Sequence, residues 1–485
     1  MARRGAAAAL LLLLAFGAGA QRSSLKDGRL LLDGRPYIIL GGELANSSAS
    51  SAAWMDGHNT WRTLSEAGLN TVLAPVYWEI IEPREGEFSF ASVDYLINSA
   101  RANDLHLVLL WFGTWKNSMS CYVPAWVKQG FGKRFTLAVG SDGDTPEILS
   151  AFCKESLKAD CKAFAALMRH LREVDSETGT VLMVQVENEI GFLGDEREHG
   201  KAAERAYAKS REKDGERFQA AAYARYAGAV AKAGKKEYDI PMFVNAALNS
   251  RGRKAGEYPS AGPLDHLYDI WRAEAPAIDL ICPDIYDPGF PDWVARYARE
   301  DNPLFIPEIR QESANAARVF YVLGRHGAIG FSPFSIDTRW QDTERAYKVL
   351  GPYLDEITEA QAQGRTYGVL LDLRHPADSF TASGITFTCK HDGTLSWSDA
   401  HGGRWDEAGL LVLDMGGGEF LFMGTGCVVT MSPADGKGHV GILSIDEYDA
   451  KARLRRLNGD EDHQGRHLRI PAGHIGVQYL KTYRY

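Results

Sequence analysis

The chain has 485 residues, a formal net charge of −9 and six cysteines. The negative balance is spread along the chain, without the basic patch that binds nucleic acid. Six cysteines are too few for a disulfide-based scaffold, and no His-Glu-x-x-His or Cys-x-x-Cys motif occurs, so we expect neither a metal nor a cofactor. This length predicts one large domain and a second, smaller one.

The first twenty residues have the pattern of a secretory signal peptide. Arg3 and Arg4 precede an apolar run over residues 6–16, and the small residues 18–20 form a cleavage site before Gln21. The run is too short to span a membrane. We therefore expect an exported protein, periplasmic or extracellular, without stable membrane insertion after cleavage.

Eight short apolar runs follow, most of them separated by stretches with helical periodicity. Apolar strands that alternate with amphipathic helices are typical of a parallel sheet covered on both faces. Eight units over about 330 residues predict an α/β fold, a (β/α)8 TIM barrel. A doubly wound open sheet is the alternative, but no glycine-rich phosphate motif follows the first strand. The predicted strands cover residues 37–42, 69–75, 105–111, 180–187, 241–246, 278–284, 303–308 and 328–334.

Helical periodicity fades past residue 364. Short alternating segments such as GITFTCKHDGTLSWS and GLLVLDM are separated there by Gly and Asp turns. This pattern predicts an antiparallel β-domain of sandwich or jelly-roll type. The chain is therefore divided into a signal peptide (1–20), a barrel (21–364) and a C-terminal β-sandwich domain (365–485).

The fourth predicted strand ends in an unusual way. The stretch VLMVQVENEIG, residues 181–191, runs from an apolar strand directly into Glu187, Asn188 and Glu189. In a barrel, the carboxyl ends of the strands surround one cavity, so Asn188 and Glu189 would be released into a pocket. A capped helix or a buried ion pair is the other explanation. A second strand-end glutamate, Glu308 in FIPEIR, favours the pocket.

Two carboxyl groups that face one another across a cavity are typical of glycoside hydrolysis. One starts protonated and gives its proton to the leaving oxygen, while the other is ionised and attacks. Aromatic faces and amides suit the faces and hydroxyls of a sugar ring. We predict Glu189 and Glu308 as the catalytic pair, and Asn188, Tyr286, Trp78, Glu43, Trp111 and Trp115 as residues that bind the substrate.

Individual roles follow from the residue types. Asn188 is predicted to donate to the 2-hydroxyl of the sugar, and Tyr286 to hydrogen-bond Glu308. The three tryptophans are predicted as sugar platforms, with packing as the alternative for each. Glu187 is predicted to pair with Arg310 or another cation as a supporting residue.

These motifs resemble those of glycoside hydrolase family 35. QVENEIG is similar to its acid/base motif, GLNTVLAPVYWEIIEPREGEFSF to its second-strand signature, and GGELANSS stands at its first-strand Gly-Glu motif. RRLNGDEDHQGRHLRIP looks like the β-domain of a bacterial branch. The resemblance implies a retaining exo-acting β-galactosidase without cofactor, in which Glu189 is the acid/base and Glu308 the nucleophile.

The chain departs from the family pattern at two places. After the third strand the family presents an Asn-Ala-Glu cluster that holds the sugar, whereas this chain reads WFGTWKNSMSCYVPAW. Pro75 stands where a tyrosine is expected. These departures concern the sugar and not the hydrolase mechanism, so the same mechanism on a β-glucoside or arabinoside is an alternative. A non-catalytic exported carbohydrate-binding protein is the alternative from another class.

Overall fold

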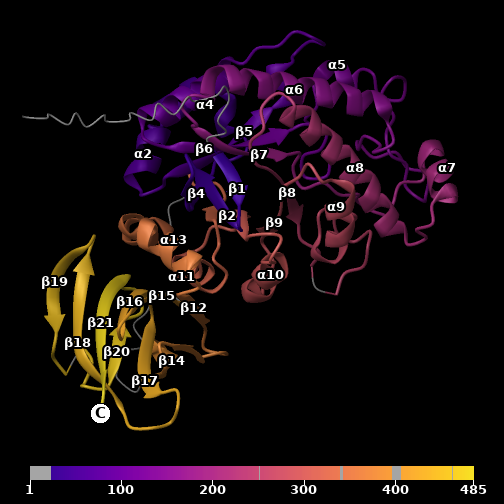
Figure 1. The fold of residues 1–485 in the computed structure, drawn as a ribbon. Coiled ribbons are helices and arrows are strands. Elements are labelled where there is room, and N and C mark those ends of the chain that lie inside the picture. Colours follow the sequence, from indigo (N-terminus) through magenta and orange to yellow (C-terminus); the bar gives the residue numbers. More distant parts are fainter. Residues whose placement is uncertain (1–22, 251, 339–341, 396–405, 461) are drawn as a thin grey trace, which may run out of the picture.

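The computed structural model describes residues 23–250, 252–338, 342–395, 406–460 and 462–485. Its larger part is a closed barrel of eight strands, and its smaller part is a pair of antiparallel sheets toward the C-terminus (Figure 1). The predicted (β/α)8 barrel followed by an antiparallel β-domain is thus confirmed. The predicted signal peptide lies outside the described residues.

Each predicted barrel strand overlaps an observed one, in the predicted order. Neighbouring barrel strands run parallel, and the last pairs with the first to close the ring. Their runs are apolar because helices cover one face and barrel side chains fill the other. The barrel strands are β4 (Ile39–Glu43), β5 (Thr71–Tyr77), β6 (His106–Phe112), β7 (Val181–Val186), β8 (Met242–Ala247), β9 (Leu280–Ile285), β10 (Phe305–Ile309) and β11 (Gly330–Pro333).

Helices surround this barrel and connect its strands. The two longest, α6 and α8, lie side by side over the strands in the middle of the barrel sequence (Figure 1). The helices are α1 (Ala52–Gly57), α2 (Thr60–Glu66), α3 (Trp78–Ile81), α4 (Ala91–Ala102), α5 (Ala125–Lys128), α6 (Lys154–Asp175), α7 (Lys201–Lys209), α8 (Gly215–Lys235), α9 (Tyr268–Glu274), α10 (Phe290–Tyr297), α11 (Asn315–Arg325), α12 (Thr343–Leu350) and α13 (Leu354–Ala362). Among the described residues, no helix is long and apolar enough to cross a bilayer.

A small antiparallel sheet precedes the barrel and was not predicted. It consists of β1 (Ser23–Lys26), β2 (Arg29–Leu32) and β3 (Arg35–Pro36). Two Asp-Gly turns connect its strands, and both residues of each turn have positive φ. Asp-Gly is a strong signal for such two-residue hairpins, so the sequence did contain the information. The Ser23 hydroxyl donates to the carbonyl of Leu182 on β7, which ties this sheet to the barrel.

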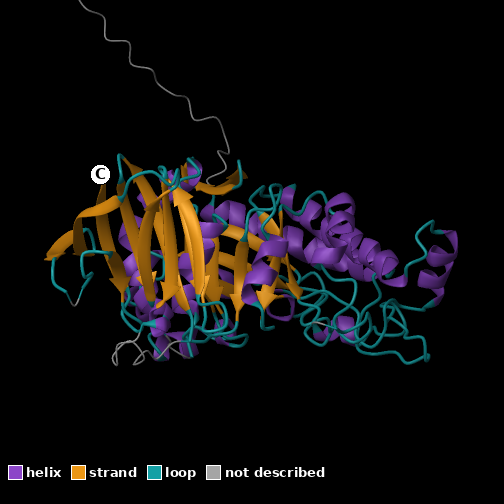
Figure 2. Cartoon of the chain, turned by 90° about the horizontal axis from the view of Figure 1, so that it is seen from below, coloured by secondary structure: helices purple, strands orange, loops and turns teal. Residues whose placement is uncertain are grey.

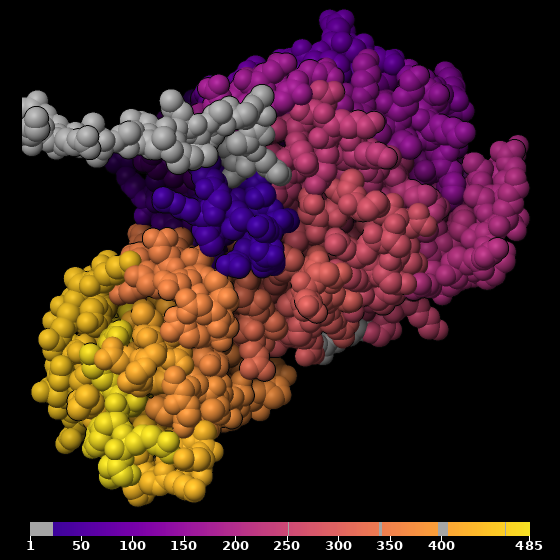
Figure 3. All heavy atoms as spheres, viewed as in Figure 1, coloured from indigo at the N-terminus to yellow at the C-terminus, as the bar shows by residue number. Residues whose placement is uncertain are grey.

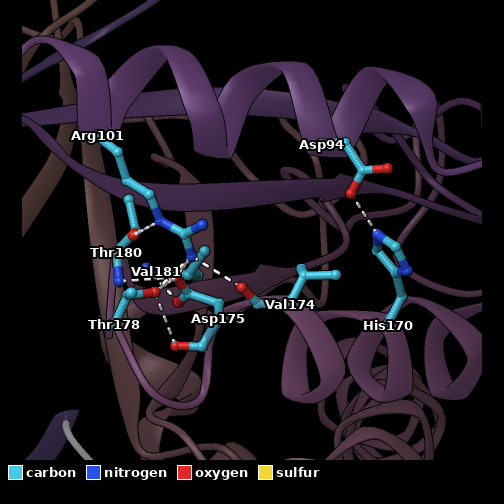
Figure 4. A network of polar contacts seen from close by, with 8 residues as sticks. All are labelled: Asp94, Arg101, His170, Val174, Asp175, Thr178, Thr180 and Val181. Carbon is cyan, nitrogen blue, oxygen red and sulfur yellow. Dashed lines mark hydrogen bonds and ion pairs between the residues drawn. The ribbon is translucent and has the colours of Figure 1, made fainter.

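An arginine cluster fixes the amino-terminal end of β7 (Figure 4). Arg101 on α4 forms an ion pair of 2.6 Å with Asp175 at the end of α6, and its Nε donates to Thr180 Oγ1. The Asp175 carboxylate in turn accepts from the backbone N–H groups of Thr180 and Val181. Two helices therefore hold the start of the strand whose other end carries Glu189.

The C-terminal domain is a sandwich of two antiparallel sheets, one of six strands and one of four. Figure 2 shows its strands gathered at one end of the molecule. The predicted boundary after residue 364 falls between α13 and β12. The strands are β12 (Thr366–Leu371), β13 (Ala377–Ala382), β14 (Ile385–His391), β15 (Ala408–Gly416), β16 (Glu419–Thr425), β17 (Cys427–Pro433), β18 (Val440–Asp449), β19 (Ala452–Leu457), β20 (His467–Ile470) and β21 (Gly476–Arg484).

The six-stranded sheet is buried on both faces where it meets the barrel helices. Along β15, Leu410 and Val412 belong to the core of the sandwich, whereas Leu411 and Leu413 belong to the core of the barrel. Helix α11 approaches so closely that a Cβ on Gly409 would lie 2.2 Å from the Ala317 carbonyl oxygen. The two lobes therefore pack as one body, which the space-filling view also shows (Figure 3).

Candidate active site

Four carboxyl groups and one ammonium group meet at the carboxyl end of the barrel. Glu43 ends β4, while Asp284 on β9 and Glu308 on β10 are register partners on neighbouring strands. Glu189 follows β7, and Lys116 follows β6. Each carboxyl group acts electrostatically on Lys116, which is only 5% exposed. We call Glu43, Glu189, Asp284 and Glu308 the carboxylate cluster.

Glu308 is held by three polar groups. It accepts hydrogen bonds from the Tyr286 hydroxyl and from Glu43, and the Lys116 charge lies nearby. Burial raises the pKa of Glu308 above its ordinary value, whereas these three groups partly offset the rise. The hydrogen bond from Tyr286 that we predicted is present, and it stabilises the ionised form of Glu308 that a nucleophile requires.

Glu189 has the electrostatics of a proton donor. Burial and the negative charge of Glu308 raise the pKa of Glu189 to about 7, while Lys116 and a hydrogen bond to Asp284 lower it. Its N–H donates to Asn245 Oδ1 at 3.0 Å, and Asn245 donates to Asp284 at 2.5 Å. Glu189 is therefore protonated below neutral pH, next to an ionised partner.

Burial disfavours the charged forms of the other two members of the carboxylate cluster. Burial, followed by the charge of Glu308, raises the pKa of both Glu43 and Asp284 well above the ordinary range. Neutral Glu43 then donates to Glu308, since a buried pair of carboxyl groups cannot both ionise. The Lys116 charge favours the ionised forms of Glu308 and Glu189.

Two loops of this site are joined along their backbones. We call residues 115–118, after β6, and residues 187–189, after β7, the paired loops. Their hydrogen bonds run from Trp115 N–H to Glu187 Oε2 (2.7 Å), from Asn188 N–H to Trp115 O (3.1 Å), from Asn117 N–H to Asn188 Oδ1 (3.3 Å) and from Ser118 Oγ to Glu189 O (2.7 Å).

The paired loops also share an unusual backbone. Left-handed conformations occur at Asn117 (φ 49°), Ser118 (φ 63°), Glu187 (φ 63°) and Glu189 (φ 47°). Such conformations cost about 1–3 kcal/mol each in residues other than glycine, and they persist only where the surroundings hold them. The hydrogen bonds between the loops supply that support and aim Lys116 and Glu189 into the same cluster.

Sequence reasoning assigned no role to four residues of this site: Lys116, Asn117, Asn245 and Asp284. Asn245 and Asp284 stand at strand ends, so their position already gave a signal. Lys116 and Asn117 lie in the segment that departs from the family pattern after the third strand. A lysine there was informative, because a buried ammonium needs several carboxylates around it.

The prediction that three tryptophans form sugar platforms is wrong. Trp78, Trp111 and Trp115 are each 0% exposed. Their indole N–H groups donate within the protein, to Glu82, Asp160 and the Leu149 carbonyl. The side chains point from the strand ends into the helix layer, so they pack the core and do not line a pocket.

The predicted partner of Glu187 is also wrong. Arg310 is exposed and donates to the Tyr286 carbonyl, with its guanidinium 5.3 Å from the Tyr286 ring centre. Glu187 is fully buried, accepts from the Trp115 N–H and lies beside Asp160. It therefore pairs with backbone and with another carboxyl group, in place of a cation.

The remaining predicted residues lie at the site. Asn188 is 2% exposed, and its side-chain oxygen accepts from the Asn117 N–H. Contacts of Asn188, Glu43 and Tyr286 with a sugar stay predictions. In the described part of the chain, no group of three or more acidic, histidine or cysteine side chains has the arrangement of a metal site.

Comparisons with known proteins agree with this arrangement. The family model for glycosyl hydrolases family 35 matches residues 29–324, and a domain of unknown function, DUF5597, matches residues 343–469. A β-galactosidase of Xanthomonas manihotis is 31% identical over 173 residues, which is 34% of this chain and 25% of that protein. The chain thus aligns with about a quarter of the length of this curated relative.

Two solved structures superpose on about two thirds of the chain. A β-galactosidase of Bacillus circulans sp. alkalophilus superposes with a TM-score of 0.50 at 15% identity, over 67% of this chain and 57% of that one. The catalytic domain of a β-amylase of Paenibacillus polymyxa gives a TM-score of 0.48 at 11% identity, over 66% of this chain and 98% of that one.

Proposed function

The chain belongs to glycosyl hydrolases family 35, and from this premise we propose that it is a retaining exo-β-galactosidase that removes terminal non-reducing β-D-galactosyl residues. The observation that carries the proposal is that Glu189 and Glu308 lie in one buried cluster, where the Glu308 charge raises the pKa of Glu189 and the Tyr286 hydroxyl donates to Glu308. The proposal also includes export of the enzyme, which the N-terminal sequence pattern supports.

The two glutamates have complementary roles in a double displacement. In the first step a Glu308 oxygen attacks the anomeric carbon, the bond to the leaving oxygen breaks, and Glu189 gives that oxygen its proton. In the second step Glu189 takes a proton from water, the water oxygen attacks the anomeric carbon, and the bond to Glu308 breaks. Two inversions give net retention.

The protonation pattern of the cluster supports this sequence. Tyr286 and neutral Glu43 donate to Glu308, so the carboxylate stays ionised before attack. Once Glu308 is bonded to the sugar, it loses its negative charge. The pKa of Glu189 then falls, because that charge was one cause of its rise. The proton donor of the first step thereby becomes the base of the second.

Hydrolysis of nitrophenyl glycosides by the purified mature chain tests the proposal. We expect turnover of the β-galactoside, with the β-glucoside and the arabinosides hydrolysed at least about tenfold more slowly in kcat/KM. Preference for either of those sugars would keep the mechanism and replace the substrate. Sugar binding without turnover of any of them would support a carbohydrate-binding protein and end the enzyme proposal.

A further inference from the structure

A pair of buried carboxyl groups lies directly behind the acid/base, outside the carboxylate cluster. Asp160 is on α6 and Glu187 follows β7, and each is 0% exposed. In the described part of the chain, neither forms an ion pair with a lysine, arginine or histidine side chain. Two ionised carboxylates without a cation would repel strongly in such a position.

Asp160 is surrounded by hydrogen-bond donors. Its carboxylate oxygens accept from the Trp111 indole N–H at 3.0 Å and from the Thr114 hydroxyl at 2.6 Å. The Tyr226 hydroxyl lies 3.5 Å from the same carboxylate and 2.8 Å from the Thr114 hydroxyl. The Asp160 carboxyl group is thus an acceptor for an indole N–H and a hydroxyl, with a second hydroxyl close by.

Glu187 has the environment of the protonated member. Its Oε2 accepts from the Trp115 N–H, and the backbone of Thr114 also favours its charged form. A side-chain hydrogen bond joins Glu187 to Asp160 and favours its protonated form. Its Oε1 receives no donor among the described residues. Burial, followed by the Asp160 charge, raises the pKa of Glu187 well above its ordinary value. A proton on Glu187 therefore satisfies both carboxyl groups at once.

The space around this pair is closed. A Cβ on Gly113 would lie 2.3 Å from the Trp111 indole nitrogen and 2.9 Å from Glu187 Oε1. A side chain at position 113 would therefore push apart the two groups that meet at Asp160. The other titratable groups that act on Glu187 are Cys161 on α6 and Tyr226 on α8, both neutral at physiological pH.

We propose that Glu187 is a positioning residue for the acid/base: a protonated carboxyl group that locks the paired loops to Asp160 on α6. The lock acts through the backbone, because Glu187 itself has a left-handed conformation and stands two residues before Glu189. Through Trp115 N–H it also fixes the loop that carries Lys116. The positioning role of Glu187 rests on the proposed function, whereas the proton that Glu187 shares with Asp160 does not depend on it.

The kinetic test compares E187A and E187Q on aryl β-galactosides with poor and good leaving groups. In E187A the Glu189 carboxyl group should no longer be held in position to protonate the leaving oxygen. We expect kcat to fall about 100-fold for the poor leaving group, which needs that proton, and less than about tenfold for the good one, which does not. The glutamine of E187Q can still donate to Asp160 and accept from Trp115. We expect it to stay within about threefold of the wild type for both substrates.

The matched control is E198A. Glu198 is another buried glutamate, 1% exposed, that accepts from the Ala151 N–H and from Gln219, away from the paired loops. Its truncation should lower the melting temperature without changing the ratio of the two kcat values. If E187A, like E198A, leaves the ratio of the two kcat values unchanged, Glu187 is merely structural and the positioning role is overturned.

A second measurement reports on the proton without using activity. The folded-state pKa of Glu187 lies above the unfolded value, so the wild type loses stability as pH rises above about 4.5, the range in which the unfolded glutamate ionises. E187Q has no such proton, and its Tm relative to the wild type should increase from pH 5 to pH 8. A Tm difference that does not change with pH would overturn the proposal that Glu187 shares a proton with Asp160. Absence of hydrolysis by the wild type would instead overturn the proposed function alone.

Discussion

The ends of β7 and β10 hold their glutamates in different ways. Glu308 lies within strand β10, and its side chain is fixed by donors, namely Tyr286 and Glu43. Glu189 lies beyond β7 in a left-handed conformation, and its backbone is fixed by Asn245 and Ser118. A nucleophile needs a stabilised charge, whereas a proton donor needs a side chain that stays available to the substrate. Two side-chain hydrogen bonds meet the first requirement. Glu189 combines main-chain hydrogen bonds with one side-chain hydrogen bond, to Asp284.

Removal of either glutamate should have the largest effect and should distinguish the two strand ends. E308G is expected to lose about 10⁴-fold or more in kcat, because no covalent intermediate can form. With an activated galactoside, azide should enter the hole on the same face and give a glycosyl azide of inverted configuration. E189G keeps the nucleophile, so its galactosyl-enzyme should form and azide should release a product of retained configuration.

The anomers of the two azide products are determined by NMR. Opposite anomers from the two variants cannot arise from packing roles. Swapped anomers would reverse the assignment of nucleophile and acid, and unchanged activity in both variants would place the catalytic pair elsewhere.

The Lys116 charge acts on both strand ends, so its loss should be the next largest effect. In the wild type, kcat/KM should fall above about pH 7, where Glu189 loses its proton. K116M removes a cation that lowers the pKa of Glu189, so this alkaline limb should move upward. The maximum of kcat/KM should drop by about 10²-fold, as for the loss of one preorganised electrostatic contact.

A pH profile of K116M and K116R provides the check. The arginine variant keeps the charge in a larger group, and we expect it to keep the alkaline limb while losing affinity. If the alkaline limb of the K116M profile lies at the same pH as that of the wild type, Lys116 does not act on Glu189 through its charge.

Loss of one hydrogen bond at β10 should have a smaller and one-sided effect. Y286F removes a donor that lowers the pKa of Glu308, so the acidic limb of the kcat/KM profile should move upward while the alkaline limb stays. A hydrogen bond to a charged group is worth about 1.5–3 kcal/mol, which corresponds to roughly 10–100-fold in rate. Movement of both limbs would show that the two strand ends are not held independently.

The smallest effect on catalysis is expected at the interface between the lobes. Arg318 on α11 is 12% exposed and pairs with Glu407 of the C-terminal domain at 2.6 Å. R318A should lower the unfolding free energy by about 1–3 kcal/mol and leave kcat within about twofold, because neither strand end contacts this pair. Thermal unfolding and kcat are measured beside R62A, whose exposed helix pair should contribute nothing measurable. A large loss of kcat in R318A would show that the C-terminal domain shapes the pocket.

The alternation of apolar strands and amphipathic helices was enough to predict the barrel. Continuous apolar runs in strands and one-sided apolar patterns in helices both follow directly from which side chains are buried. It missed the sheet at the N-terminus, whose strands are too short to show a period, although its Asp-Gly turns were visible. The domain that follows was recognisable from its short alternating segments separated by Gly and Asp turns. Residues 410–413 do not alternate in polarity, because their side chains enter two cores in turn. A strand buried on both faces reads as continuous apolar sequence.

The site was predicted in part. Glu189 and Glu308 stood out because each is a carboxylate at the end of an apolar strand. A purely structural role seldom explains a carboxylate at that position. The tryptophans did not reveal their direction, because an indole at a strand end can turn toward the pocket or toward the helices. Lys116 was missed because its meaning depends on four carboxyl groups that are far apart in sequence and meet only in the closed barrel.

Trapping of the covalent intermediate tests the central claim most directly. A 2-deoxy-2-fluoro-β-galactoside with a good leaving group slows hydrolysis of the galactosyl-enzyme more than its formation, so the intermediate accumulates. Mass spectrometry of the intact chain followed by peptide mapping should find one fluorosugar, attached to Glu308. Attachment to another residue would contradict the assignment of the nucleophile, and turnover of the parent galactoside without any adduct, with inverted product, would contradict the retaining mechanism.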